Sequence, residues 1–237
     1  MKNVNLKILA LIGAMSLPLS AQAADMAYDT ASVSWTGFYG GVHAGYGFGQ
    51  GDITNSSPPG PPTRTIGVDM DGFLGGVQIG YNWQASDTMV FGIVGDFSLA
   101  GIGGTFVNVP PPGPPFTVTS DINWMATLRA RAGYLVQPET LLYAHGGLAV
   151  ADIDATWTRG AAPGGPGPFR GIGSNTEIGW TIGAGVEHML SDKVSLFAEY
   201  AYADFGTARF ANTTGPAINY SQDVSIHTIK FGLNYRF

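Results

Sequence analysis

Apolar side chains recur at every second position in eight segments of the chain. The uncharged faces comprise Phe38, Val42, Ala44, Tyr46 and Phe48; Phe73, Val77, Ile79, Tyr81 and Trp83; Met89, Phe91, Ile93, Phe97 and Leu99; Trp124, Ala126, Leu128, Ala130, Ala132 and Tyr134; Leu142, Ala144, Leu148 and Val150; Ile178, Trp180, Ile182, Ala184 and Val186; Val194, Leu196, Ala198, Tyr200 and Tyr202; and Ile229, Phe231, Leu233, Tyr235 and Phe237. Alternation with a period of two residues predicts β-strands. Charges lie only on the opposite faces, as with Asp96 and Arg129.

Composition distinguishes between two architectures for eight such strands. A soluble sandwich would place the polar faces in water, but only 12% of the residues are charged, against about 25% in typical soluble domains. Glycine is abundant, with 35 residues, and it recurs on the polar faces at Gly41, Gly45 and Gly147. A barrel in lipid turns its uncharged face toward hydrocarbon and fills a narrow lumen with small and charged side chains. The sequence therefore predicts an all-β fold, an eight-stranded antiparallel up-and-down transmembrane β-barrel.

The lengths of the connections support the same fold. They alternate without exception between long and short, at residues 50–68, 84–87, 100–120, 137–139, 152–175, 191–192 and 206–222. Outer-membrane barrels pair long outer loops with short periplasmic turns, so we expect both ends of the barrel in the periplasm. Aromatic residues cluster at both ends of the strands, with Trp83 and Tyr134 at the turn end and Trp124 and Trp180 at the loop end. Such clusters predict two interfacial girdles.

The first 23 residues have the layout of a secretory signal peptide. Lys2 and Lys7 accompany an apolar run over residues 8–19, and Ala21-Gln22-Ala23 follows. This pattern predicts cleavage between Ala23 and Ala24. We therefore expect a signal peptide at 1–23, a periplasmic lead at 24–34 and the barrel at 35–237. The predicted mature chain has a formal charge of 9 minus 17, or −8, which argues against nucleic acid as a partner.

Three motifs carry a resemblance to a known family. WTGFYGGVHAGYGFG (35–49), YAHGGLAVADI (143–153) and IKFGLNYRF (229–237) resemble the small outer-membrane surface antigens of alphaproteobacteria, a group of OmpA-like barrels. The resemblance implies the bacterial outer membrane as location, with outer-membrane lipid and lipopolysaccharide as surroundings. It also implies transient contact with the barrel-assembly machinery through a C-terminal signal formed by Phe231, Leu233, Tyr235 and Phe237.

Inward charges near the middle of the barrel suggest how the lumen is occupied. The residues expected there are Asp96, Arg129, Arg131, Glu187, Glu199 and Lys230. Buried charges persist when they are paired, and an eight-stranded barrel has room for little beyond side chains. We expect Arg129 and Lys230 to bridge Asp96 and Glu199 and so close the barrel. The alternative is that the same residues line a porin-like channel for small solutes.

Neither catalysis nor a cofactor is expected. Ser225 and His227 share one face of the last strand, but residues two apart on a strand lie roughly 7 Å apart, and no orienting acid is evident. His43 and His145 face the lumen from opposite strands, where hydrogen-bonded polar residues are a better reading than a metal site. No haem motif is present.

Three proline-rich stretches remain, at 58–65, 110–119 and 163–171. Proline keeps such segments extended and solvated. They are expected on the outer side, as tolerant loops or as stalks that contact host molecules, phage or lipopolysaccharide sugars. The expected role is therefore structural and surface-exposed, in envelope integrity and antigenic contact.

Overall fold

The computed structural model describes residues 34–56, 64–108, 115–160, 169–211 and 219–237. The signal peptide, its Ala23/Ala24 cleavage point and all of the expected lead except Ser34 lie outside these residues. Eight strands are present: β1 (Gly37–Ser56), β2 (Arg64–Gln84), β3 (Met89–Asn108), β4 (Phe116–Gln137), β5 (Thr140–Arg159), β6 (Phe169–Met189), β7 (Val194–Ala211) and β8 (Asn219–Arg236). Within the described ranges, no helix has the length and apolar character needed to cross a membrane.

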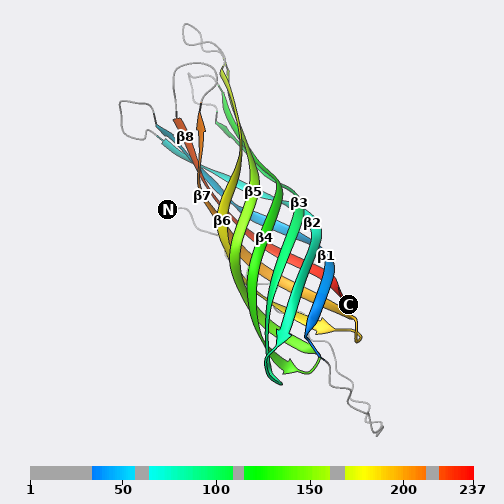
Figure 1. Ribbon diagram of the computed structural model, residues 1–237. Coiled ribbons are helices and arrows are strands. Elements are labelled where there is room, and N and C mark those ends of the chain that lie inside the picture. Colours follow the sequence, from blue (N-terminus) through cyan, green and yellow to red (C-terminus); the bar gives the residue numbers. More distant parts are fainter. Residues whose placement is uncertain (1–33, 57–63, 109–114, 161–168, 212–218) are drawn as a thin grey trace, which may run out of the picture. The chain divides into compact units, whose positions relative to one another are not determined.

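Each strand pairs antiparallel with the next, and β1 also pairs with β8, so the sheet closes into a barrel (Figure 1). The closing ladder runs from Tyr39 opposite Arg236 to Ser56 opposite Asn219. Where all eight ladders are present, closure satisfies the main-chain hydrogen-bonding groups of every strand, which lipid cannot do. The predicted eight-stranded up-and-down barrel is thus confirmed.

The strands are longer than the sequence predicted. Much of each expected long loop is strand, because β1 and β2 extend to Ser56 and Arg64, and β5 and β6 to Arg159 and Phe169. The reason is that side-chain polarity reverses toward the loop ends. On β1, Phe38 and Val42 face outward near the turn end, but farther along the outward position is Asp52 and the inward one is the buried Ile53.

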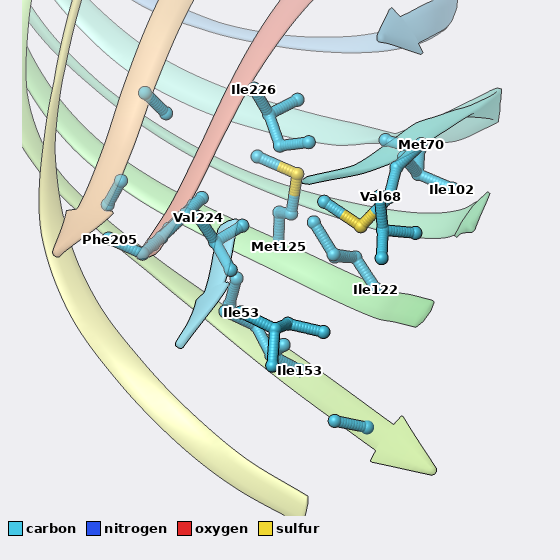
Figure 2. Packing of buried hydrophobic residues seen from close by; sticks show 14 of the residues in the cluster. Ile53, Val68, Met70, Ile102, Ile122, Met125, Ile153, Phe205, Val224 and Ile226 are labelled. Atoms are coloured by element: carbon cyan, nitrogen blue, oxygen red, sulfur yellow. The ribbon is translucent and has the colours of Figure 1, made fainter. Parts of the chain in front are cut away.

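The inside of the barrel near the loop ends is an apolar core. Its buried members include Ile53, Val68, Met70, Leu74, Ile102, Val118, Ile122, Met125, Ile153, Trp157, Phe205, Val224 and Ile226. Figure 2 shows ten of these side chains directed toward one another from the surrounding strands. Apolar inside and polar outside is the arrangement of a barrel in water, so this half of the strands extends beyond the lipid.

The loop half of the barrel is also divided into two leaves. The β2–β3 ladder ends at Asp71 opposite Gly103, and the β6–β7 ladder ends at Trp180 opposite Asp204. Past these points the described residues pair within two four-stranded groups, β7-β8-β1-β2 and β3-β4-β5-β6. The apolar core lies between the two leaves, since Val68 and Val224 come from one and Ile122 from the other.

Candidate functional site

The central layer of the lumen is organised by the guanidinium of Arg129 on β4. It donates to Asp96 on β3 at 2.8 Å and to Glu199 on β7 at 2.6 Å. Lys230 on β8 contacts Asp96 at 3.1 Å. The expected arrangement had both cations bridging both carboxylates, whereas here Arg129 bridges the two and the ion pair of Lys230 is with Asp96. The hydroxyl groups of Thr127 and Tyr143 also donate to Asp96 and Glu199.

These charges are almost completely buried. The side chain of Arg129 is 2% exposed, and those of its two carboxylate partners are 1% and 5% exposed. Ions removed from water are stable only when paired and hydrogen-bonded. In the central layer two cations face two carboxylates, and each carboxylate also accepts a hydroxyl hydrogen bond. Among the described residues, Oδ1 of Asp96 and Nε of Arg129 have no hydrogen-bond partner. The layer is therefore a network of buried ion pairs across the lumen.

Both lumen histidines have polar partners. Nε2 of His43 lies 2.9 Å from the Ser98 hydroxyl. Nε2 of His145 lies 3.2 Å from an Arg129 nitrogen and 3.5 Å from a Glu199 oxygen. No three histidine or carboxylate side chains within the described ranges are grouped to hold a metal ion. The histidines are thus part of the ionic layer and its surroundings.

A second ionic layer lies one inward position closer to the turns. Arg131 pairs with Glu187 on β6 at 2.9 Å and donates through Nε to Asn82 at 2.9 Å. Its guanidinium lies over the rings of Tyr39 and Tyr143, 4.9 and 5.1 Å from the centroids. The side chains of Ser195 and Asn234 donate to the same Glu187 carboxylate. The layer is therefore fixed by both charge and aromatic packing.

Trp35 closes the turn end, and sequence reasoning missed this role. The residue precedes β1 and is fully buried. Its indole nitrogen donates to the Pro138 carbonyl at 2.9 Å, its main-chain nitrogen to the Gln84 side chain at 2.9 Å, and Arg236 lies 5.0 Å over its ring. An apolar cluster with Val90, Leu135, Leu141, Tyr143 and Met189 surrounds it. Sequence patterns assign Trp35 no role beyond the start of the barrel, because its burial depends on strand ends that meet only in space.

Glycine allows the main chains of β4 and β5 to approach closely beside the central ionic layer. Gly147 lies opposite Arg129 in the β4–β5 register. A Cβ atom there would collide with the Leu128 carbonyl and lie 2.7 Å from the Arg129 Cα. This close approach accounts for glycine on the inner face of a tight barrel.

Gly147→Ala is expected to destabilise the barrel by about 1–3 kcal/mol, as overpacking does. Gly75→Ala is the matched control, because a Cβ at this outward position would lie 3.5 Å from its nearest neighbour, the His43 carbonyl. Urea unfolding of both variants in lipid vesicles, followed by tryptophan fluorescence, measures the difference. Equal midpoints for the two variants would contradict the packing argument.

The outer wall carries the predicted aromatic and C-terminal residues. Trp83, Tyr134 and Trp180 are exposed on the outside of the barrel. The expected assembly signal, Phe231, Leu233, Tyr235 and Phe237, is likewise exposed along one face of the last strand. His227 lies 2.7 Å from the Tyr200 hydroxyl and stacks on Phe48. Its hydrogen-bond partner is therefore a tyrosine and not Ser225.

Comparison with known proteins gives consistent matches. A family model described as "Outer membrane protein beta-barrel domain" matches residues 8–237. The "31 kDa outer-membrane immunogenic protein" of Brucella melitensis is 32% identical, over 97% of this chain and 98% of the relative. The "25 kDa outer-membrane immunogenic protein" of Brucella abortus is 27% identical, over 98% and 99%. Among solved structures, the outer membrane protein OprG from Pseudomonas aeruginosa is similar with a TM-score of 0.48 and 11% identity, over 85% of this chain and 97% of the other.

Proposed function

The chain belongs to the outer membrane β-barrel family, and from this premise we propose that it has a structural and surface-exposed role with a sealed lumen. Its location is the outer membrane, as for relatives named outer-membrane proteins. Those relatives are also named immunogenic proteins, which supports exposure of the loop end at the cell surface. The proposed role is therefore envelope integrity together with antigenic contact, without catalysis.

One observation carries the sealed lumen. Arg129 holds Asp96 and Glu199 at 2.8 and 2.6 Å across the middle of the barrel. For a solute to pass, Arg129 would have to separate from both carboxylates while all three side chains remain buried. An unpaired buried charge is costly. Layers of buried side chains lie on both sides, the apolar core toward the loops and the Trp35 cluster toward the turns. Sealing is the role that this arrangement favours.

Single-channel conductance in a planar bilayer tests the seal. We expect no steady channel from the refolded mature chain and measurable leakage from Glu199→Gln, which keeps the shape of the side chain but removes its charge. Lys193→Gln, in an exposed turn, is the matched control and is expected to stay silent. Steady conductance of the unaltered protein would overturn the seal and support the alternative, a porin-like channel for small solutes.

The partners follow from the same proposal. Outer-membrane lipid and lipopolysaccharide would contact the exposed aromatic wall, because tyrosine and tryptophan favour the membrane interface. The barrel-assembly machinery would read the Phe231 to Phe237 face during insertion. Contact with host molecules or phage would occur at the loop end of the barrel.

A further inference from the structure

A buried hydrogen bond connects the two leaves of the loop half. Nε2 of Gln222 on β8 donates to the hydroxyl of Ser120 on β4 at 2.8 Å. Both residues are fully buried. Val224 and Ile122, each two residues farther along the same inward face, belong to the apolar core and point into it in Figure 2. The bond therefore crosses the core from one leaf to the other.

Stability alone does not account for a glutamine at this position. Within the part of the chain that the structure describes, Oε1 of Gln222 has no hydrogen-bond partner, and a buried acceptor without a partner costs free energy. The main chain nevertheless makes room for the amide, because a Cβ atom at Gly51 on the neighbouring β1 would collide with its nitrogen. Hydrophobic contacts are non-directional, whereas a hydrogen bond requires a narrow range of distance and angle. The bond can therefore fix an alignment that the apolar core leaves free.

Strand pairing is irregular at the level where the two leaves begin. The β2–β3 ladder ends at Gly103 and the β6–β7 ladder at Asp204. At the same level the β3–β4, β4–β5 and β7–β8 registers shift, next to Leu99, Trp124 and Asp204. Gly206, within the last of these shifts, adopts a φ of 63°. An extra residue in one strand of a pair bends that strand, so this level is where a leaf can change direction.

The register shifts are not shared equally by the two leaves. β4 has one on each of its ladders at this level, whereas neither ladder of β1 is shifted. The leaf β7-β8-β1-β2 thus continues the barrel wall, and the leaf β3-β4-β5-β6 can bend against it. The main chains of the leaves touch next to the ladder ends, where a Cβ atom at Gly104 or Gly179 would collide with a carbonyl of the other leaf. Farther toward the loops, no described ladder joins them.

From these observations we infer that the Gln222–Ser120 hydrogen bond is a latch, which holds the leaf β3-β4-β5-β6 in one position against the other leaf. Without the latch, this leaf moves about the level of the shifted registers while the apolar core keeps the leaves in contact. Two polar side chains thus give the loop half a single arrangement. The latch is independent of the sealed lumen, because Arg129 and Asp96 lie on the turn side of the shifted registers.

Distances between spin labels on the two leaves test the latch. The chain contains no cysteine, so a pair of introduced cysteines carries labels at defined positions. Thr54→Cys on β1 with Thr156→Cys on β5 places one label on each leaf. Val42→Cys with Leu148→Cys is the reference pair, on the same two strands but nearer the turns. In pulsed electron paramagnetic resonance of the full mature chain in lipid vesicles, we expect one narrow distance distribution for each pair.

Gln222→Leu removes the latch and keeps an apolar side chain in its place. We expect a broadened distribution for the leaf pair, with about fivefold more of the altered arrangement, as the loss of one hydrogen bond implies. The reference pair should not change. Ser120→Ala should act in the same way, and both substitutions together should act no more strongly than either alone, because they remove one shared bond. Thr228→Val removes a buried hydroxyl from the same strand and is the matched control, expected to leave both distributions narrow.

Unheated gel electrophoresis reports whether each variant forms the barrel, and Ser120→Ala, the smaller change, tests the latch even if Gln222→Leu does not fold. Narrow distributions in both single variants would overturn the inference, as would an equally broad distribution in the unaltered protein. Broadening that adds up in the double variant would also overturn it, because lost core volume would then be the cause. Conductance of the same proteins reports separately on the sealed lumen.

Discussion

Arg129→Ala is expected to lower the free energy of unfolding by about 3–5 kcal/mol, the cost of leaving a buried charge without its partner. The substitution removes the only group that contacts both Asp96 and Glu199 in the described ion pairs. Lys230 would remain with Asp96, while the described partners left to Glu199 would be His145 and the Tyr143 hydroxyl. Urea unfolding in lipid vesicles measures the loss, and unheated gel electrophoresis reports whether the barrel still forms.

Two comparisons identify the cause of this loss. Lys193→Ala, in an exposed turn, should change stability by less than about 0.5 kcal/mol. The double variant Arg129→Met, Glu199→Gln should be more stable than Arg129→Ala, because it removes both partners of one buried ion pair and leaves Lys230 paired with Asp96, which costs less than removing one partner. If the double variant were the less stable of the two, the packing of Arg129 rather than its charge would be responsible.

Trp35→Ala is the second large effect, with an expected loss of about 3–5 kcal/mol. The indole is fully buried, and its removal leaves a cavity among Leu135, Leu141 and Met189. It also removes the link between the start of β1 and the Pro138 carbonyl in the β4–β5 turn. Hydrogen exchange should therefore accelerate at the turn ends of β1 and β8 before it does elsewhere.

Trp35→Phe and Trp83→Ala provide the controls for this prediction. The phenylalanine variant keeps most of the apolar volume but loses the indole hydrogen bond, which is worth about 1 kcal/mol. Trp83 lies at the same end of the barrel but is 58% exposed on the outer wall, so its replacement should cost clearly less than that of Trp35. Similar losses for Trp35→Ala and Trp83→Ala would mean that Trp35 is an ordinary interfacial residue.

The sequence allowed the barrel and its inward residues to be predicted because strand alternation fixes the facing of every side chain. Arg129 and Asp96 face the lumen for this reason alone. Alternation does not fix the distance across a lumen, so the bridge of Arg129 to Glu199 and the contact of Lys230 with Asp96 required coordinates. The alternation thus predicts the direction in which a side chain points but not the residue that it contacts.

The loop half was misread for a different physical reason. Beyond the lipid the solvent changes while the alternation continues, so outward positions become Asp52 or Asp152 and inward ones Ile53 or Ile153. A search for uncharged outward faces ends where lipid ends, and it assigns the remaining strand residues to loops. The signal that could have found them is the reversed alternation itself.

The two-leaf division has a consequence for immune recognition. One leaf joins the first two strands to the last two, so that Asp52 lies opposite Asp223 on its outer face. Side chains from the first and last strands thus form one surface, so an antibody that covers this leaf would contact segments far apart in the sequence. An antiserum raised against linear peptides should recognise denatured protein but bind this surface poorly, whereas folded barrel is the immunogen that presents it intact.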